Sequence, residues 1–155
     1  MSVYFNRKEE LKEKANKHYK EMEELLKEEI AECVKNTTVY GGNGESVNAA
    51  VKRKEDKDMM DEMADTVEAI EKPEIFVDKL DSVKSMLQHR HGKTAVLNFA
   101  SYKNPGGKFM EGSSAQEECL CHSSNLYNIL KRFPDYYEWN KKHNNRALYT
   151  NRALY

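Results

Sequence analysis

The sequence predicts an α/β fold behind a helical N-terminal region, and three patterns lead to this expectation. Residues 6–35 form a long amphipathic pattern with helical spacing. Two short apolar runs, 74–77 and 94–100, enclose a helical pattern, which gives the strand–helix–strand order of an α/β sheet. Glycines follow the second run, at the edge of a sheet where ligands bind. We therefore expect a helical region over 1–72 and a sheet-containing domain over 73–155.

Composition restricts the class of protein before any motif is considered. A chain of 155 residues is long enough for one domain, and its net charge of −1 argues against a protein that mainly coats nucleic acid. Cys33, Cys119 and Cys121 do not form a disulfide framework. No apolar run approaches the roughly 20 residues that span a membrane, and the first residues lack a signal peptide's apolar core. We expect a reduced, cytoplasmic protein that does not associate with membranes.

The first predicted element is a helix over residues 6–35. Its apolar residues recur every three or four positions: Leu11, Ala15, Tyr19, Met22, Leu26, Ile30 and Cys33. This pattern favours a helix packed on a domain, and a coiled coil is the alternative. The glycines that follow, at 41–44, lack the Lys-Ser/Thr ending of a phosphate loop and are interpreted as a turn. Residues 52–72 are polar and predict a loop that leads into a short helix.

Two predicted strands and a helix come next. "EIFV" after Pro73 is typical of a short strand, and "DKLDSVKSMLQ" at 78–88 predicts a helix. "TAVLNFA" at 94–100 is the most strand-like run in the chain. It is apolar on both faces, as expected for a buried parallel strand. Asn98 lies inside this strand and is therefore a candidate ligand-binding residue.

A glycine loop and a further helix follow the second strand. Gly106 and Gly107 carry no side chain, so backbone amides can approach a ligand closely. Ser113 or Ser114 is expected to cap a helix that runs to about Arg132 and ends before Pro134.

The first turn of this helix would hold Glu117 and Glu118. Acidic residues are favoured in a first turn by the helix dipole alone. The dipeptide Glu-Glu also occurs four times in the chain, at 9–10, 23–24, 28–29 and 117–118. Spacing alone therefore leaves a catalytic pair and an ordinary pair of surface acids both open.

Other candidate sites are weaker. His89 with His91, and Cys119 with His122, are pairs of metal-ligating residues without an evident third ligand. Cys119 and Cys121 are better explained as small buried apolar residues. The aromatic cluster at 136–139 is typical of a core.

The stretch "VLNFASYKNPGGKFMEGSSAQEECLCHSSNLY" resembles the catalytic segment of microbial-type poly(ADP-ribose) glycohydrolases, members of the macrodomain superfamily. Their signature is a glycine-rich loop, a short spacer and Gln-Glu-Glu. Here the loop is Gly106-Gly107 and the triplet is Gln116-Glu117-Glu118. The resemblance is close over about residues 94–155.

The resemblance implies a macrodomain-like mixed sheet flanked by helices, with an N-terminal helical extension. It implies a hydrolase that cleaves the ribose–ribose bond of poly(ADP-ribose), or removes ADP-ribose from a protein or nucleic acid. Glu118 would be the catalytic acid, Glu117 would hold ribose hydroxyls, and Gln116 would support the arrangement. Gly106 and Gly107 would contact the distal ribose and the diphosphate. The family requires no metal or cofactor.

The chain departs from the family pattern in two ways. Lys108 stands where the third glycine is usual, and its side chain can either obstruct the ligand or place a cation beside the diphosphate. Family members also continue through further strands and a second glycine-rich loop, so we expect this chain to be the N-terminal part of such a domain. An ADP-ribose-binding module without turnover is the alternative function. A helical protein that binds a partner through residues 6–35 is a third.

Overall fold

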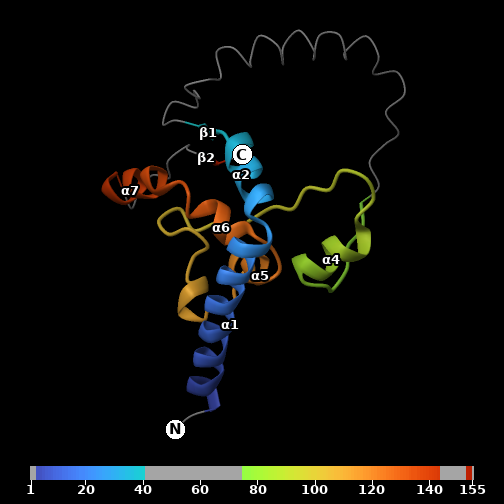
Figure 1. The fold of residues 1–155 in the computed structure, drawn as a ribbon. Helices are drawn as coiled ribbons and strands as arrows, with labels where there is room; N and C mark the ends of the chain where they lie inside the picture. Colours follow the sequence, from blue (N-terminus) through green and yellow to red (C-terminus); the bar gives the residue numbers. More distant parts are fainter. Residues whose placement is uncertain (1–2, 41–74, 144–152, 155) are drawn as a thin grey trace, which may run out of the picture. The chain divides into compact units, whose positions relative to one another are not determined.

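A computed structural model describes residues 3–40, 75–143 and 153–154 (Figure 1). The chain divides into two compact units, one comprising residues 1–36 and 78–145 and the other residues 37–77 and 146–155. The second unit pairs two short antiparallel strands, β1 (Val39–Tyr40) and β2 (Ala153–Leu154). The first unit carries the helices: α1 (Val3–Leu25), α2 (Lys27–Asn36), α4 (Ser82–His89), the 3₁₀ helix η2 (Phe109–Glu111), α5 (Gln116–His122), α6 (Leu126–Leu130) and α7 (Pro134–Lys142).

The predicted α/β fold, with a macrodomain-like mixed sheet, is wrong for the part of the chain that the structure describes. These residues are mostly helical, and their strand pairing is confined to two residues on each side. Residues 75–77 and 94–100 are not in strands, and Val77, Leu97 and Phe99 are 95%, 73% and 71% exposed. Apolar and β-branched residues give only a local preference for extended backbone. A strand forms when a neighbour satisfies its backbone groups, and the described residues provide no such neighbour here.

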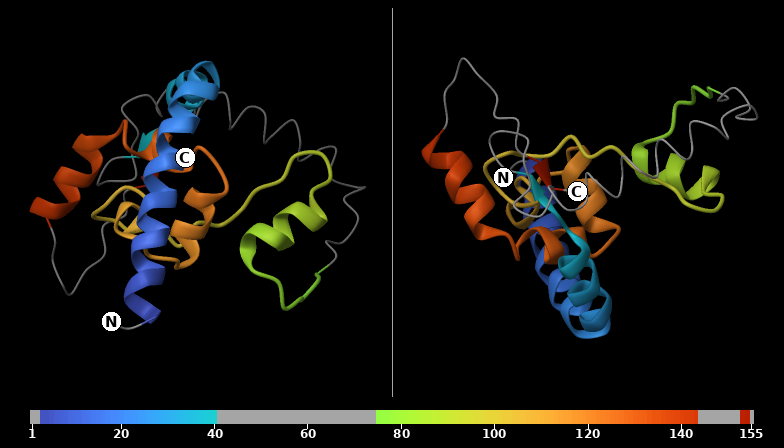
Figure 2. Two further views of the ribbon diagram at one scale, coloured as in Figure 1. Left: turned by 60° about the horizontal axis from the view of Figure 1, so that its bottom comes forward. Right: turned by 90° about the horizontal axis from the view of Figure 1, so that it is seen from above.

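The predicted N-terminal helix forms as two helices that meet at Leu26. α1 packs against η2 and α6, and Figures 1 and 2 show it running alongside the orange helices of the same unit. Its buried Ala15 joins Phe109 and Cys121 in a small core, and Met110, Leu126 and Tyr127 pack around that core. The helix therefore packs on the unit that contains Glu117 and Glu118, as the packed-helix interpretation expected.

Polar contacts also join α1 to α6. The fully buried Asn128 donates from Nδ2 to Tyr19 O at 3.0 Å and to Glu23 Oε1 at 3.1 Å. Arg132 Nη2 lies 2.6 Å from Glu23 Oε2, and Lys131 Nζ donates to the Tyr19 hydroxyl at 2.9 Å. A buried amide that donates to both backbone and carboxylate fixes how the two helices are aligned.

The single helix predicted from Ser113 or Ser114 to Arg132 is wrong, because residues 123–125 divide it into α5 and α6. The hydroxyls of Ser123 and Ser124 donate to Cys119 O and Leu120 O, at 3.0 and 2.8 Å. These bonds satisfy carbonyls at the end of α5 in place of a further helical turn. The N-cap is Ala115, without a side-chain cap, and Pro134 begins α7 instead of ending a helix.

The remaining predictions concern one helix, a turn and a loop. The helix predicted over 78–88 forms as α4, whose N-cap Asp81 accepts from Lys84 N through Oδ1 at 2.9 Å. The turn predicted at 41–44 and the loop at 52–72 lie outside the described residues. None of the helices in the described part of the chain is long and apolar enough to cross a membrane.

Candidate functional site

The glycine loop is a tight turn that ends at η2. Gly107 N donates to Asn104 O at 3.0 Å, and Phe109 N donates to Gly106 O at 3.0 Å. Gly106 and Gly107 have φ of 64° and 60°, in the left-handed region that favours glycine. The two residues therefore allow the chain to turn between residues 104 and 109.

Close packing imposes a second requirement for glycine at these positions. A Cβ on Gly107 would lie 2.5 Å from Glu118 Oε1 and 3.2 Å from Glu117 Oε2. A Cβ on Gly106 would lie 2.7 Å from Tyr127 Cδ2 and 3.1 Å from Cys121 Sγ. One glycine thus lets the loop approach the two carboxylates, and the other lets it pack on α5 and α6.

Glu117 is buried at 3% exposure and is held by the segment that precedes the loop. Its Oε2 accepts from Ser101 N at 2.8 Å, and its Oε1 accepts from Asn98 Nδ2 at 3.5 Å. Burial raises the pKa of Glu117, and the charge of Glu118 acts in the same direction. The hydrogen bonds from Ser101 and Asn98 oppose that shift, but the pKa remains raised.

Glu118 is also buried, at 6% exposure, but it is held by a different segment. Its Oε1 accepts from Lys108 N at 2.8 Å, immediately after the two glycines. Within the described residues, Oε2 of Glu118 accepts no hydrogen bond. The two neighbouring carboxylates are therefore fixed by separate parts of the chain, and one oxygen of Glu118 is left for another partner.

Gln116 connects α5 to the extended segment that contains Asn98. Its Oε1 accepts from Phe99 N at 2.9 Å, and its Nε2 donates to Leu97 O at 2.8 Å. The side-chain amide thus pairs with the backbone at alternate residues, as a neighbouring strand would. Nε2 also lies 3.4 Å from Ser82 Oγ at the start of α4.

The structure brings the predicted site residues into one cluster. Asn98 and Gln116 fix the extended segment to α5, and Gly107 lies against both glutamates. Asn98 Oδ1 is buried and has no hydrogen-bond partner among the described residues. The arrangement brings a carboxylic acid, backbone amides and an unpaired amide oxygen together in this cluster.

Sequence reasoning missed how three residues contribute to this cluster. Ser101 and Lys108 act through backbone N–H groups, for which side-chain type gives no signal. Tyr137 is buried, and its pKa is raised by burial first and then by the charge of Glu117. The aromatic cluster was interpreted as core, which is confirmed for Tyr137.

The cysteines beside the glutamates are poorly suited to nucleophilic chemistry. Burial, together with the charges of Glu117 and Glu118, raises the pKa of Cys121 to about 12. This residue is a thiol at neutral pH, whereas a nucleophilic cysteine must be a thiolate. The interpretation as a buried apolar residue is confirmed for Cys121, while Cys119 is half-buried.

The predicted histidine pairs do not gather metal ligands. Among residues 3–40, 75–143 and 153–154 there is no group of three His, Cys, Asp or Glu side chains able to hold an ion. His89 Nε2 instead lies 3.3 Å from Asp78 Oδ2. The ring of His122 packs edge-on against Phe109, with centroids 4.6 Å apart, and burial lowers its pKa.

The comparisons with known proteins identify the catalytic family. The family described as microbial-type PARG, catalytic domain, matches residues 7–155, which is nearly the whole chain; PARG stands for poly(ADP-ribose) glycohydrolase. No curated protein and no solved structure matches the sequence. The match includes α1 from residue 7 onward, as well as the glycine loop and Gln116-Glu117-Glu118.

Proposed function

This chain belongs to the microbial-type PARG catalytic-domain family, and on that premise we propose a specific hydrolysis with Glu118 as the acid. The bond cleaved is the O-glycosidic ribose–ribose bond of poly(ADP-ribose), or the bond that attaches ADP-ribose to a macromolecule. One observation carries the proposal. Two buried glutamates lie against a glycine loop, and the second keeps an oxygen without a hydrogen bond within the described residues.

One acid serves both steps of the proposed reaction. Neighbouring residues on a helix point about 100° apart, so Glu117 and Glu118 do not face each other across a bond as paired glycosidase carboxylates do. Glu118 gives its proton to the departing ribose oxygen while the glycosidic bond breaks and positive charge develops at the anomeric carbon. The resulting carboxylate then takes a proton from the water that attacks this carbon, which restores the acid.

The neighbouring residues would position the substrate. Glu117 would hold ribose hydroxyls, in an orientation set by its bonds to Ser101 N and Asn98 Nδ2. Gly106 and Gly107 would let the loop backbone approach the distal ribose and the diphosphate. Gln116 would keep the segment with Asn98 beside α5.

The second candidate is an ADP-ribose-binding module without turnover. Lys108 favours it, because this residue replaces the third glycine of the family's loop with a long side chain. The loop would then bind a ligand, but the altered contacts would not align the bond with Glu118.

Calorimetric titration with ADP-ribose, followed by incubation with poly(ADP-ribose) and product analysis, separates the candidates. We expect binding, and release of ADP-ribose from the polymer. Binding without product would favour the module. If the chain neither binds ADP-ribose nor releases it from the polymer, both candidates are contradicted.

A further inference from the structure

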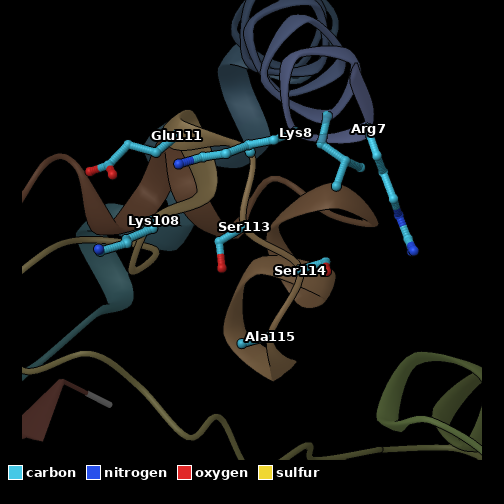
Figure 3. A pocket seen from close by; sticks show the side chains of 9 residues that line it. Arg7, Lys8, Lys108, Glu111, Ser113, Ser114 and Ala115 are labelled. Atoms are coloured by element: carbon cyan, nitrogen blue, oxygen red, sulfur yellow. The ribbon is translucent and has the colours of Figure 1, made fainter. Parts of the chain in front are cut away.

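A cationic pocket lies between α1 and the segment that leads into α5 (Figure 3). Arg7 and Lys8 come from α1, and Lys108, Ser113 and Ser114 come from the segment. The volume is about 390 Å³, within the range of small-ligand pockets. In the view of Figure 3 the two serine hydroxyls lie between the head groups of Lys108 and Arg7.

A glycine sets the geometry of this pocket. Gly112 has φ of 78°, and a Cβ there would collide with the carbonyl oxygen of Lys8. Only glycine allows α1 to lie this close, and the buried contact of Ala15 with Phe109 holds the helix in place. The cations of α1 are therefore brought to the segment by backbone packing, and their own side chains are not needed for it.

The charge of the pocket fits an anion. Its lining carries three cations, Arg7, Lys8 and Lys108, against one carboxylate, Glu111, a balance of +2 in a chain of net charge −1. None of these cations takes part in an ion pair within the described residues, where six such pairs form. Guanidinium, ammonium and hydroxyl groups are the donors that bind phosphate.

Lys108 connects the pocket to the proposed catalytic acid. Its backbone N–H binds Glu118 Oε1, while its exposed side chain lines the pocket. Ser113 and Ser114 lie within four residues of Glu117 in the chain. A polymer held with its scissile bond at Glu118 would therefore have phosphate groups close to this pocket.

We propose that the Arg7–Lys8–Lys108 pocket binds a phosphate group of poly(ADP-ribose) next to the bond that is cleaved. This inference rests on the proposed function, because the polymer supplies the phosphate. Of the two roles considered for Lys108 in place of the family's third glycine, the inference favours a cation beside a diphosphate over a side chain that obstructs the ligand. Apart from Lys108, the lining comes from residues outside the glycine loop, so the pocket would select for a chain of units over a single ADP-ribose.

The test compares two double variants that remove the same charge. Arg7→Gln/Lys8→Gln removes two cations from the pocket, and Lys20→Gln/Lys27→Gln removes two exposed cations elsewhere on α1 and α2. Steady-state kinetics on poly(ADP-ribose) should show KM raised about tenfold in the pocket variant, with kcat within about twofold of wild type. The slope of log KM against log salt concentration should fall by about one to two, because one to two fewer phosphate contacts are made. Calorimetry with inorganic pyrophosphate should show binding to wild type and to the control, and at least about fivefold weaker binding to the pocket variant.

Three outcomes would overturn the inference. They are equal changes in both double variants, no pyrophosphate binding by the wild-type chain, and loss of pyrophosphate binding with an unchanged KM for the polymer. If the wild-type chain does not cleave the polymer, the proposed function fails. The pocket is then tested by direct titration with uncleaved polymer. Equal affinity of the two double variants for the polymer would overturn the inference.

Discussion

Two Glu-Glu pairs in this chain occupy the same position in a helix and have opposite environments. Glu28 and Glu29 lie in the first turn of α2 and are exposed, whereas Glu117 and Glu118 lie in the first turn of α5 and are buried. A helix dipole favours acidic residues in a first turn, so position in the helix does not account for the difference. The difference comes from the glycine loop, which packs against the second pair and not the first. Burial under the glycine loop, and not the position in the helix, thus marks Glu117 and Glu118 as a candidate site.

The largest effect is expected when the loop is forced away from the buried pair. Gly107→Ala should lower the free energy of unfolding by about 2–5 kcal/mol and abolish hydrolysis. Its Cβ would lie 2.5 Å from Glu118 Oε1, on a backbone with φ of 60°. Chemical denaturation and a polymer-cleavage assay measure the two effects.

Gly92→Ala is the matched control for that substitution. Gly92 has nearly the same φ, 62°, but a Cβ there would meet nothing within 4 Å. It should cost only the backbone strain, about 1–2 kcal/mol, and leave hydrolysis intact. Equal losses in the two variants would mean that the contact with the glutamates is unimportant.

A smaller effect is expected from the residue that precedes the buried pair. Gln116→Met removes the bonds to Phe99 N and Leu97 O while keeping a side chain of similar length. The amide hydrogen of Phe99 should exchange roughly five to ten times faster, because each such bond contributes about 1 kcal/mol.

Gln88→Met, at an exposed position of α4, is the control for that experiment and should leave the exchange at Phe99 unchanged. Hydrogen exchange followed by mass spectrometry or NMR gives the comparison. An unchanged rate in Gln116→Met would show that another contact holds residues 97–99.

The smallest expected effect is a difference between the two Glu-Glu pairs in how stability depends on pH. Burial raises the folded pKa of Glu117 above the unfolded value near 4.5, so the folded state retains the proton to higher pH. The stability from the neutral carboxyl is complete below the unfolded pKa and is lost as pH rises through the folded pKa. Glu117→Gln should remove this loss, whereas Glu28→Gln should keep it.

Thermal melts from pH 4 to pH 8 give this comparison as the difference in Tm between each variant and wild type. Using differences cancels the opposite contribution of His122, whose lowered pKa reduces stability as pH falls. A wild-type minus Glu117→Gln difference that does not change with pH would contradict the assigned direction.

Sequence patterns were reliable where the determinants are local. The spacing of Leu11, Ala15 and Ile30 predicted packed helical structure, and Gly106 and Gly107 predicted a loop; both form. The break at residues 123–125 was missed because a serine hydroxyl bonds to a backbone carbonyl only in certain rotamers, and the sequence does not give the rotamer.

The predicted sheet failed for a different physical reason. Residues 94–100 have strand-like composition, but a strand requires a partner, and the pattern of one segment does not specify it. In the described structure Gln116 supplies two hydrogen bonds to this segment and no strand does so. The contacts from Ser101 N and Lys108 N were equally unpredictable, since every residue other than proline carries a backbone N–H.

We propose that burial against the glycine loop makes Glu118 the acid, in contrast to an exposed glutamate in the same helical position. The most direct measurement is the rate of ADP-ribose release from poly(ADP-ribose) by Glu118→Gln and by Glu29→Gln, with ADP-ribose binding measured for both. Glu118→Gln should release no ADP-ribose above background and still bind it, and Glu29→Gln should match wild type. Full turnover by Glu118→Gln would contradict the account.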